Sequence, residues 1–184
     1  MIMTEKTLTI LGSTGSIGRQ TLEVAEPLGM EIRALTANSN IELLEEQIRK
    51  YRPAVAAVYE EKAAEQLAEK IKDTKTRVLK GMDGILEAAG ESGADIIVTA
   101  IAGTAGLQPT LAAVTTGRRV AIANKEPLVC AGELVMQTAR EHGTEIIPVD
   151  SEHSAIFQCL VGQGSRERVG INFKSSKELL YLSD

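Results

Sequence analysis

The sequence predicts an α/β fold in which helices cover both faces of a doubly wound parallel sheet. Short runs of β-branched and apolar residues alternate with helix-length segments along most of the 184 residues. These strand-like runs are apolar almost throughout, which is typical of parallel strands buried on both faces. A glycine-rich turn follows the first run, at the position where doubly wound domains bind nucleotides.

The first half of the chain supplies four expected strands, each followed by a helix. The strands are expected over residues 7–11, 31–37, 54–59 and 77–79. The helices are expected over residues 17–27 and 41–50, over a charged Ala/Glu/Lys segment after residue 59, and over residues 84–89. In the second of these helices, Ile41, Leu44 and Ile48 recur at the helical spacing.

The second half continues the same alternation. Strands are expected over residues 95–99, 119–123 and 145–149, and helices over residues 106–116 and 128–141. Because crossovers between parallel strands are right-handed, this order gives a doubly wound domain. From residue 162 the chain is polar, interrupted by glycine and only weakly periodic.

Composition and charge exclude several classes of protein. A net charge of −5 and the absence of a Lys/Arg-rich run argue against a nucleic-acid-binding protein. No apolar run reaches the roughly 18 residues of a membrane span, and the N-terminus lacks the pattern of a signal peptide. The chain is therefore expected to be soluble and cytoplasmic, with Cys130 and Cys159 as reduced, buried thiols.

The glycine-rich turn has the spacing of a nucleotide-binding loop. In ILGSTGSIGRQTLEV, a strand precedes and a helix follows Gly12, Gly15 and Gly18, a variant of the dinucleotide fingerprint. Glycines there permit a tight turn, a close approach of the backbone to a pyrophosphate, and close packing of helix on strand. Hydroxyl groups in the loop, Ser13 among them, would add donors. A purely structural turn is the alternative, but the position after the first strand favours nucleotide binding.

The end of the second strand bears on the choice of cofactor. It reads TANSN over residues 36–40 and contains no Asp or Glu to bind a ribose 2′-hydroxyl, which disfavours NAD. Small polar residues leave room for a 2′-phosphate, although no Arg or Lys stands there to pair with it. NADP is therefore preferred by exclusion.

Two later loops fall at the same predicted edge of the sheet. The segment TAIAGTAGLQPTL (99–111) carries two glycines before a helix, and a structural turn explains it as well as cofactor contact does. In VAIANKEPLV (120–129), Lys125 follows a strand and precedes Pro127, a residue suited to the first turn of a helix. Open α/β sheets bind ligands at this edge, so Lys125 is a candidate ligand contact as well as a surface lysine.

The segment IIPVDSEHSAIF (146–157) ends a strand in a cluster of polar residues. Asp150 and Glu152 are two apart, so an extended backbone places both carboxylates on one face. Paired oxygen ligands suit Mg²⁺ or Mn²⁺ better than zinc. A helix cap at Asp150 is the alternative, while His153 is expected to be packed or outside the ligand set.

Three segments, LTILGSTGSIG, ANKEPLV and PVDSEHSAIFQ, closely resemble the 1-deoxy-D-xylulose 5-phosphate reductoisomerase family over about residues 7–161. The resemblance implies a Rossmann-like NADPH-binding domain and the divalent-metal-dependent conversion of 1-deoxy-D-xylulose 5-phosphate to 2-C-methyl-D-erythritol 4-phosphate in non-mevalonate isoprenoid biosynthesis. In that family the metal chelates adjacent substrate oxygens during a carbon-skeleton rearrangement, and NADPH reduces the resulting aldehyde.

The resemblance also implies roles for individual residues. NADPH contacts are expected from Gly12, Thr14, Gly15, Ser16, Ile17, Asn38, Ser39, Asn40, Asn124 and Glu126. The sugar phosphate substrate is expected to contact Lys125, Ser151 and Glu152, with Lys125 and Glu152 as catalytic residues. Two of the family's three metal carboxylates would be Asp150 and Glu152.

Two features depart from the family pattern. Ser39 stands where the family often has a basic residue, and the match ends near Gly162 although the family continues for about as many residues again. The chain is therefore expected to be a shortened form, inactive alone, with an NADPH-binding domain over residues 1–149 and the start of a metal-binding catalytic domain over residues 150–184. The alternatives are an NADP-binding module without catalysis, pairing with another chain or as a homodimer, and an NAD(P)-dependent dehydrogenase domain of another class.

Overall fold

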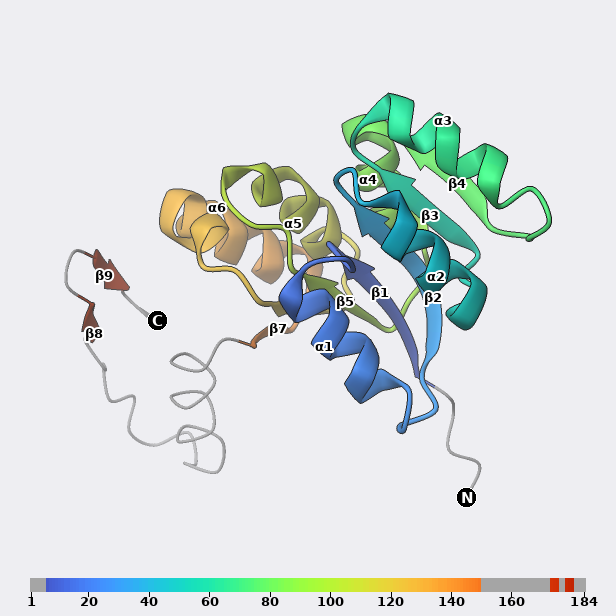
Figure 1. Ribbon diagram of the computed structural model, residues 1–184. Helices are drawn as coiled ribbons and strands as arrows, with labels where there is room; N and C mark the ends of the chain where they lie inside the picture. The colour runs from blue at the N-terminus through green and yellow to red at the C-terminus, as the bar shows by residue number, and fades with distance from the viewer. Residues whose placement is uncertain (1–5, 150–172, 176–177, 181–184) are drawn as a thin grey trace, which may run out of the picture.

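A seven-stranded parallel sheet lies between two layers of helices (Figure 1). The computed structural model describes residues 6–149, 173–175 and 178–180. The strands of the sheet are β1 Thr7–Leu11, β2 Glu31–Ala37, β3 Val55–Val58, β4 Arg77–Lys80, β5 Ile96–Thr99, β6 Arg119–Ile122 and β7 Ile146–Pro148. A separate antiparallel pair consists of β8 Phe173–Ser175 and β9 Glu178–Leu180.

Helices alternate with the strands of this sheet. They are α1 Ser16–Ala25, α2 Ile41–Tyr51, α3 Glu61–Lys70, α4 Gly81–Glu91, the 3₁₀ turn η1 Thr104–Gly106, α5 Leu107–Val114 and α6 Glu126–His142. The predicted series is confirmed, with shifts at the ends of most elements. The largest shift is in α4, which is longer than the expected 84–89 at both ends.

The strand order is β4-β3-β2-β1-β5-β6-β7, and all neighbouring pairs are parallel. The first four strands therefore proceed outward in one direction from β1, and the last three proceed in the other. The order reverses between β1 and β5, which makes this the switch point where open α/β sheets bind ligands. The predicted doubly wound fold is confirmed.

Buried side chains fill both sides of the sheet. On one side, Leu8 and Ile10 of β1 pack in a cluster with the buried residues of α1, α2 and α3. On the other, Leu11 packs in a cluster that includes Val114 of α5 and Val135 of α6. Complete burial of each such side chain contributes about 1.5–3 kcal/mol, so these clusters hold the carboxyl ends of the strands in a rigid frame.

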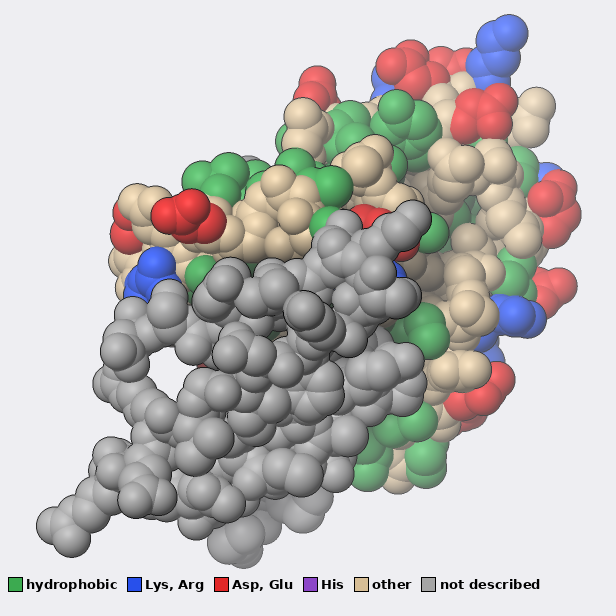
Figure 2. Space-filling view, turned by 90° about the vertical axis from the view of Figure 1, so that its left-hand side faces the viewer, with side chains coloured by type: hydrophobic (Ala, Val, Ile, Leu, Met, Phe, Trp, Pro, Cys, Tyr) green, Lys and Arg blue, Asp and Glu red, His purple; other side chains and the backbone are tan. Residues whose placement is uncertain are grey.

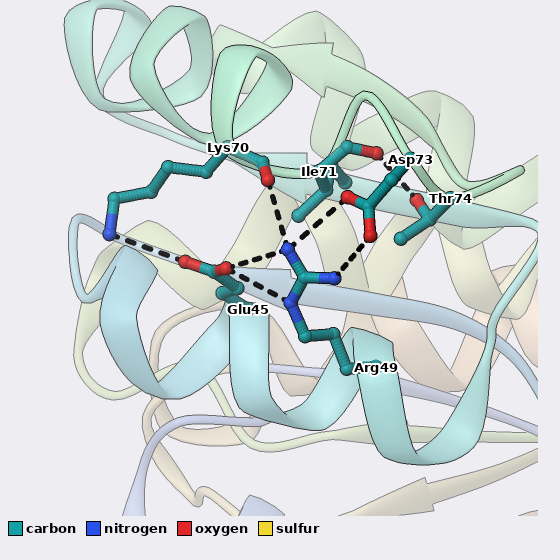
Figure 3. Close-up of polar contacts among 6 residues, drawn as sticks. All are labelled: Glu45, Arg49, Lys70, Ile71, Asp73 and Thr74. Carbon is teal, nitrogen blue, oxygen red and sulfur yellow. Dashed lines mark hydrogen bonds and ion pairs between the residues drawn. The ribbon is translucent and has the colours of Figure 1, made fainter.

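An exposed network of charges joins α2 to α3 and to the turn that follows α3 (Figure 3). Arg49 Nε donates to Glu45 Oε1 (3.0 Å), and Arg49 Nη1 donates to Asp73 Oδ2 (2.7 Å). Lys70 Nζ donates to the other oxygen of Glu45 (3.2 Å). Because Arg49 donates to both carboxylates, it lowers the pKa of Glu45 and the pKa of Asp73 below their ordinary values.

Helix α6 exposes apolar side chains, and here one expectation is wrong. Cys130 is exposed, not buried. It lies in the first half of α6, where the backbone departs from helical geometry at Ala131 (φ −149°, ψ 34°). Val129, Leu134 and Met136 of the same helix are also exposed, because its packed face is formed by Val135 and Ala139 instead.

Acidic and basic side chains are interspersed over the described surface that faces the viewer in Figure 2. Within the described ranges, every helix is too short or too polar to cross a lipid bilayer.

Candidate functional site

The loops that follow β1, β2, β5 and β6 meet at the carboxyl edge of the sheet. The Gly12 amide in the first loop donates to the Thr36 hydroxyl at the end of β2 (2.9 Å). The Ala100 amide, just after β5, donates to the carbonyl oxygen of Leu11 (2.8 Å). The structure therefore brings the glycine loop together with two of the other segments singled out in the sequence.

The glycine loop leads into α1 with three of its amide groups available. Gly15 is the N-cap of α1 and supplies no side-chain cap, and the first turn contains no acidic residue. Among the described residues, no group accepts a hydrogen bond from the amides of Thr14, Ser16 and Ile17. Free amides at the positive end of a helix dipole form an anion-binding site. This geometry fits the pyrophosphate of a dinucleotide.

Two glycines, Gly12 in the loop and Gly18 in α1, are required by close backbone contacts. Gly12 has a φ of +90°, and a Cβ added to it would lie 2.7 Å from the carbonyl oxygen of Ala100. A Cβ on Gly18 would lie 2.3 Å from the carbonyl oxygen of Gly12. The helix thus packs directly on the turn, as the fingerprint predicts.

Ser13 does not face the open edge, so its expected role as a ligand donor is wrong. It is fully buried, and its hydroxyl donates to Gln47 Oε1 of α2 (2.7 Å). Gln47 Nε2 donates in return to the Ser13 carbonyl oxygen (3.0 Å), and the Ser13 amide donates to the Thr36 carbonyl oxygen (2.8 Å).

Sequence reasoning missed both Thr36 and Gln47 as residues that support the site. One signal was available for Gln47: it is a polar residue next to Leu44 and Ile48 on the apolar stripe of α2. A polar side chain on such a stripe needs a buried partner.

The segment after β2, residues 38–40, is exposed, and its last residue caps α2. Asn40 is the N-cap of α2, and its side-chain oxygen accepts a hydrogen bond from the Leu43 amide (3.2 Å). The Asn38 carbonyl oxygen accepts from the Glu60 amide (3.0 Å). Asn38, Ser39 and Asn40 are all exposed, so their remaining polar groups face solvent.

Asn124 joins the loop after β6 to the loop after β5. Its amide nitrogen donates to the carbonyl oxygen of Ile101, and its side-chain oxygen is buried without a partner among the described residues. Gly106 lies under this contact, because a Cβ there would lie 2.9 Å from the Asn124 amide nitrogen. Asn124 therefore has a structural contact that the sequence did not predict.

Lys125 and Glu126 follow directly at the start of α6. Lys125 is the N-cap and is exposed, and the carbonyl oxygen of Lys125 accepts a hydrogen bond from the Val129 amide (2.9 Å). Glu126 is the first residue of the helix and is half-buried. Lys125 forms no ion pair with any residue of the described part, so its ammonium group is available to an anionic ligand.

The predicted metal ligands Asp150 and Glu152 lie outside the described residues, as does Ser151. The chain reaches the carboxyl edge beside β6 at Val149, whose amide donates to the Ile122 carbonyl oxygen (3.0 Å). Within residues 6–149, no group of three His, Cys, Asp or Glu side chains is placed to hold a metal ion.

Hollows also lie at the opposite, amino-terminal edge of the sheet. Lys6, Asp95, Arg118 and Glu145 contribute to their walls. The two carboxylates already form ion pairs. Asp95 Oδ1 lies 3.9 Å from Arg118 Nη1, and Glu145 Oε2 lies 2.7 Å from Arg119 Nη2. Paired charges leave little net field for an ionic ligand, and these hollows are at the far ends of the strands from the glycine loop. The carboxyl edge is therefore the candidate site.

Comparison with known proteins identifies the family of the chain. A model of the 1-deoxy-D-xylulose 5-phosphate reductoisomerase family matches residues 8–132. The chain belongs to this family. It is 48% identical over 162 residues to the 1-deoxy-D-xylulose 5-phosphate reductoisomerase of Ruminiclostridium cellulolyticum, covering 88% of this chain and 42% of that protein. It is 52% identical over 165 residues to that of Heliobacterium modesticaldum, with the same two coverages. The chain thus spans about two fifths of the length of these relatives.

Solved structures of the reductoisomerase family share the fold. The Zymomonas mobilis enzyme in complex with NADPH matches with a TM-score of 0.82 at 43% identity, covering 85% of this chain and 41% of that one. A second reductoisomerase, in complex with NADPH, fosmidomycin and magnesium, matches with a TM-score of 0.80 at 42% identity, covering 84% and 38%. An archaeal homoserine dehydrogenase matches at 20% identity with a TM-score of 0.52, covering 77% and 43%, which shows the fold alone. Family membership disfavours the alternative of a dehydrogenase of another class.

Proposed function

We propose that this chain binds NADPH across the carboxyl ends of β1, β2 and β5 and serves the reductoisomerase reaction of its family. The observation that carries the proposal is the set of free amides at the start of α1, immediately after a turn that only glycine can form. The relatives whose structures contain NADPH support the choice of ligand.

The pyrophosphate is proposed to lie on the amides of Thr14, Ser16 and Ile17, with Gly12 and Gly15 allowing its close approach. The hydroxyl groups of Thr14 and Ser16 remain suitable donors, whereas that of Ser13 is buried and committed. Thr14 is half-buried and Ser16 is exposed, so both are near the surface of the loop.

The 2′-phosphate is proposed to lie on Asn38, Ser39 and Asn40. Because the Asn40 side-chain oxygen already accepts from Leu43, its amide nitrogen is the group left to donate to a phosphate oxygen. The segment offers amide and hydroxyl donors but no cation, so the preference for NADPH over NADH would rest on hydrogen bonds and on the absence of a carboxylate.

The remaining parts of the site are proposed from the family pattern. Asn124 and Glu126 would lie near the nicotinamide, and Lys125 would contact the sugar phosphate with Ser151 and Glu152. Asp150 and Glu152 would hold Mg²⁺ or Mn²⁺, which would supply Lewis-acid polarisation of substrate oxygens. Val149 supports this placement, because it brings the chain to the same edge one residue before Asp150.

The proposed reaction converts 1-deoxy-D-xylulose 5-phosphate to 2-C-methyl-D-erythritol 4-phosphate with NADPH as reductant. Residues 1–149 would form the NADPH-binding domain, and residues 150–184 would begin the catalytic, metal-binding domain. Both reactants are dissolved metabolites, so the cytoplasm is the proposed location. A homodimer is the proposed assembly, with the exposed apolar residues of α6 in its support.

Two measurements test the proposal. Titration of the chain with NADPH and NADH, followed by nucleotide fluorescence, should show saturable binding with NADPH preferred. Steady-state NADPH oxidation with 1-deoxy-D-xylulose 5-phosphate and Mg²⁺ then distinguishes an enzyme from a binding module. Equal affinity for NADH, or failure to bind either nucleotide, would contradict the proposed cofactor site.

A further inference from the structure

We infer that Gln47 of α2 is a positioning residue that sets the orientation of the nucleotide-binding loop. The inference rests on the proposed function, because it explains how the loop is held ready for a pyrophosphate. Gln47 does not reach the open edge itself, since only 5% of its surface is exposed.

Both polar atoms of the Gln47 side chain form hydrogen bonds with Ser13. Its Oε1 accepts from the Ser13 hydroxyl (2.7 Å), and its Nε2 donates to the Ser13 carbonyl oxygen (3.0 Å). Ser13 is itself fully buried. A buried amide left without partners costs about 1–3 kcal/mol, so this two-point contact strongly favours one position of the loop relative to α2.

The contact fixes the peptide group that joins Ser13 to Thr14. In a trans peptide, the carbonyl of one residue and the amide of the next point in opposite directions. Gln47 holds the carbonyl oxygen of Ser13, so the amide of Thr14 points away from α2. That amide has no acceptor among the described residues. Gln47 therefore directs a free donor toward the place proposed for the pyrophosphate.

Thr36 holds the preceding peptide groups. Its hydroxyl accepts from the Gly12 amide (2.9 Å), and its carbonyl oxygen accepts from the Ser13 amide (2.8 Å). The amides of Gly12 and Ser13 are thus turned inward, while the amide of Thr14 is turned outward. Thr36 and Gln47 together produce this alternation.

Helix α2 also connects the two proposed phosphate sites. Asn40, proposed to contact the 2′-phosphate, is its N-cap, and Gln47 lies seven residues later. At 1.5 Å per residue, the separation along the helix is about 10 Å. The same rigid helix therefore sets both the 2′-phosphate segment and the pyrophosphate loop.

The first test compares two variants of α2. Gln47→Met keeps the length of the side chain and removes both hydrogen bonds, and it should raise the Kd for NADPH by about tenfold. Ile48→Val, at the neighbouring buried position, is the control: it should lower the Tm and leave the Kd unchanged. If Gln47→Met raises the Kd and Ile48→Val does not, the loss of affinity cannot be explained by a lower Tm. A Kd equal to that of wild type would overturn the inference.

A second variant supplies a pH signature that a purely structural role would not give. Gln47→Glu keeps the acceptor for the Ser13 hydroxyl but places a second oxygen against the Ser13 carbonyl. Protonation of the introduced carboxyl group restores the donor, so affinity for NADP⁺, relative to wild type, should recover as the pH falls toward the ordinary carboxyl pKa of about 4.3. Gln47→Met should show no such recovery. The same pH response in both variants would count against positioning by hydrogen bonds.

Hydrogen–deuterium exchange without nucleotide separates this inference from the proposed function. Gln47→Met should increase deuterium uptake in the peptide that spans residues 10–17, and Ile48→Val should not. If wild type fails to bind NADPH, the proposed function fails, and this uptake still decides whether Gln47 orders the loop. Unchanged uptake would overturn the inference even when wild type binds.

Discussion

Gly18 lies so close to Gly12 that a Cβ on Gly18 would stand 2.3 Å from the Gly12 carbonyl oxygen. The neighbouring atoms in this contact belong to the backbone of the nucleotide loop, so they cannot yield as a flexible side chain would. This contact therefore limits how far α1 can move relative to the loop.

Gly18→Ala should displace the loop from α1. Overpacking of this kind costs about 1–3 kcal/mol, and the displaced amides should lose affinity for NADPH. Gly90→Ala is the matched control, because Gly90 also lies in a helix, α4, and a Cβ there would meet nothing within 4 Å. Alanine there should stabilise the protein by about 0.5–1 kcal/mol. Urea unfolding and NADPH titration of both variants provide the comparison, and tolerance of Gly18→Ala would refute the tight contact.

Asn124→Ala should loosen the loop between β5 and α5. It removes the hydrogen bond to the Ile101 carbonyl oxygen, at a cost of about 1 kcal/mol. Asn124→Asp has nearly the same shape but sets an oxygen against that carbonyl, so it should be at least as destabilising. Urea unfolding and deuterium uptake over residues 100–106 measure both effects. Wild-type stability in Asn124→Asp would show that the contact is dispensable.

Asp95→Asn should reduce the loss of stability in acid. The amide and hydroxyl of Thr7 donate to Asp95, and these hydrogen bonds hold the pKa of Asp95 below its ordinary value. A depressed folded-state pKa contributes stability that is present above the unfolded value, about 3.9, and is lost as the pH falls through the folded-state pKa. Asp95→Asn should therefore be destabilised near neutral pH and show a flatter decline below about pH 4. Glu23→Gln, an exposed change on α1, is the control, and parallel pH profiles for wild type and Asp95→Asn would contradict the prediction.

Arg49→Gln should lower the Tm slightly, and added salt should erase the difference from wild type. The Arg49 network is exposed, and at 1 M salt the Debye length falls to about 3 Å. Leu44→Ala, which empties a buried position in the same helix, should cost about 2–5 kcal/mol at either salt concentration. Thermal unfolding at low and high salt separates the two mechanisms. A difference for Arg49→Gln that persists in high salt would mean that the network acts through packing.

Asp150→Ala and Glu152→Ala should each weaken Mn²⁺ binding if these carboxylates are the proposed ligands. Free Mn²⁺ can be followed by electron paramagnetic resonance as the chain is titrated. His153→Ala serves as the neighbouring control, because the imidazole is expected to lie outside the ligand set. Loss of Mn²⁺ binding in His153→Ala, with binding retained in the other two variants, would show that the two carboxylates are not the ligands.

The fold was predictable because its signals are local. Strands such as Thr7–Leu11 and Glu31–Ala37 are short runs rich in β-branched and aliphatic residues, and their predicted bounds agree with the structure. The start of α1 was also predictable, since glycine spacing reports directly on backbone geometry.

The internal contacts of the site were less accessible to sequence reasoning. The partners Ser13 and Gln47 are 34 residues apart, and Asn124 and Ile101 are 23 apart, so no local pattern joins them. For the same reason, the sequence of the glycine loop could not show which of its hydroxyl groups turns inward.

The position of β1 in the sheet also affects how the chain folds while it is being synthesised. Its partner β2 follows after one helix, but its other neighbour begins beside Asp95, 88 residues from Thr7. As the chain leaves the ribosome, the first four strands can assemble while one edge of β1 still lacks its partner. Unpaired apolar edges are templates for aggregation, so the nascent chain is most vulnerable in the interval before β5 emerges.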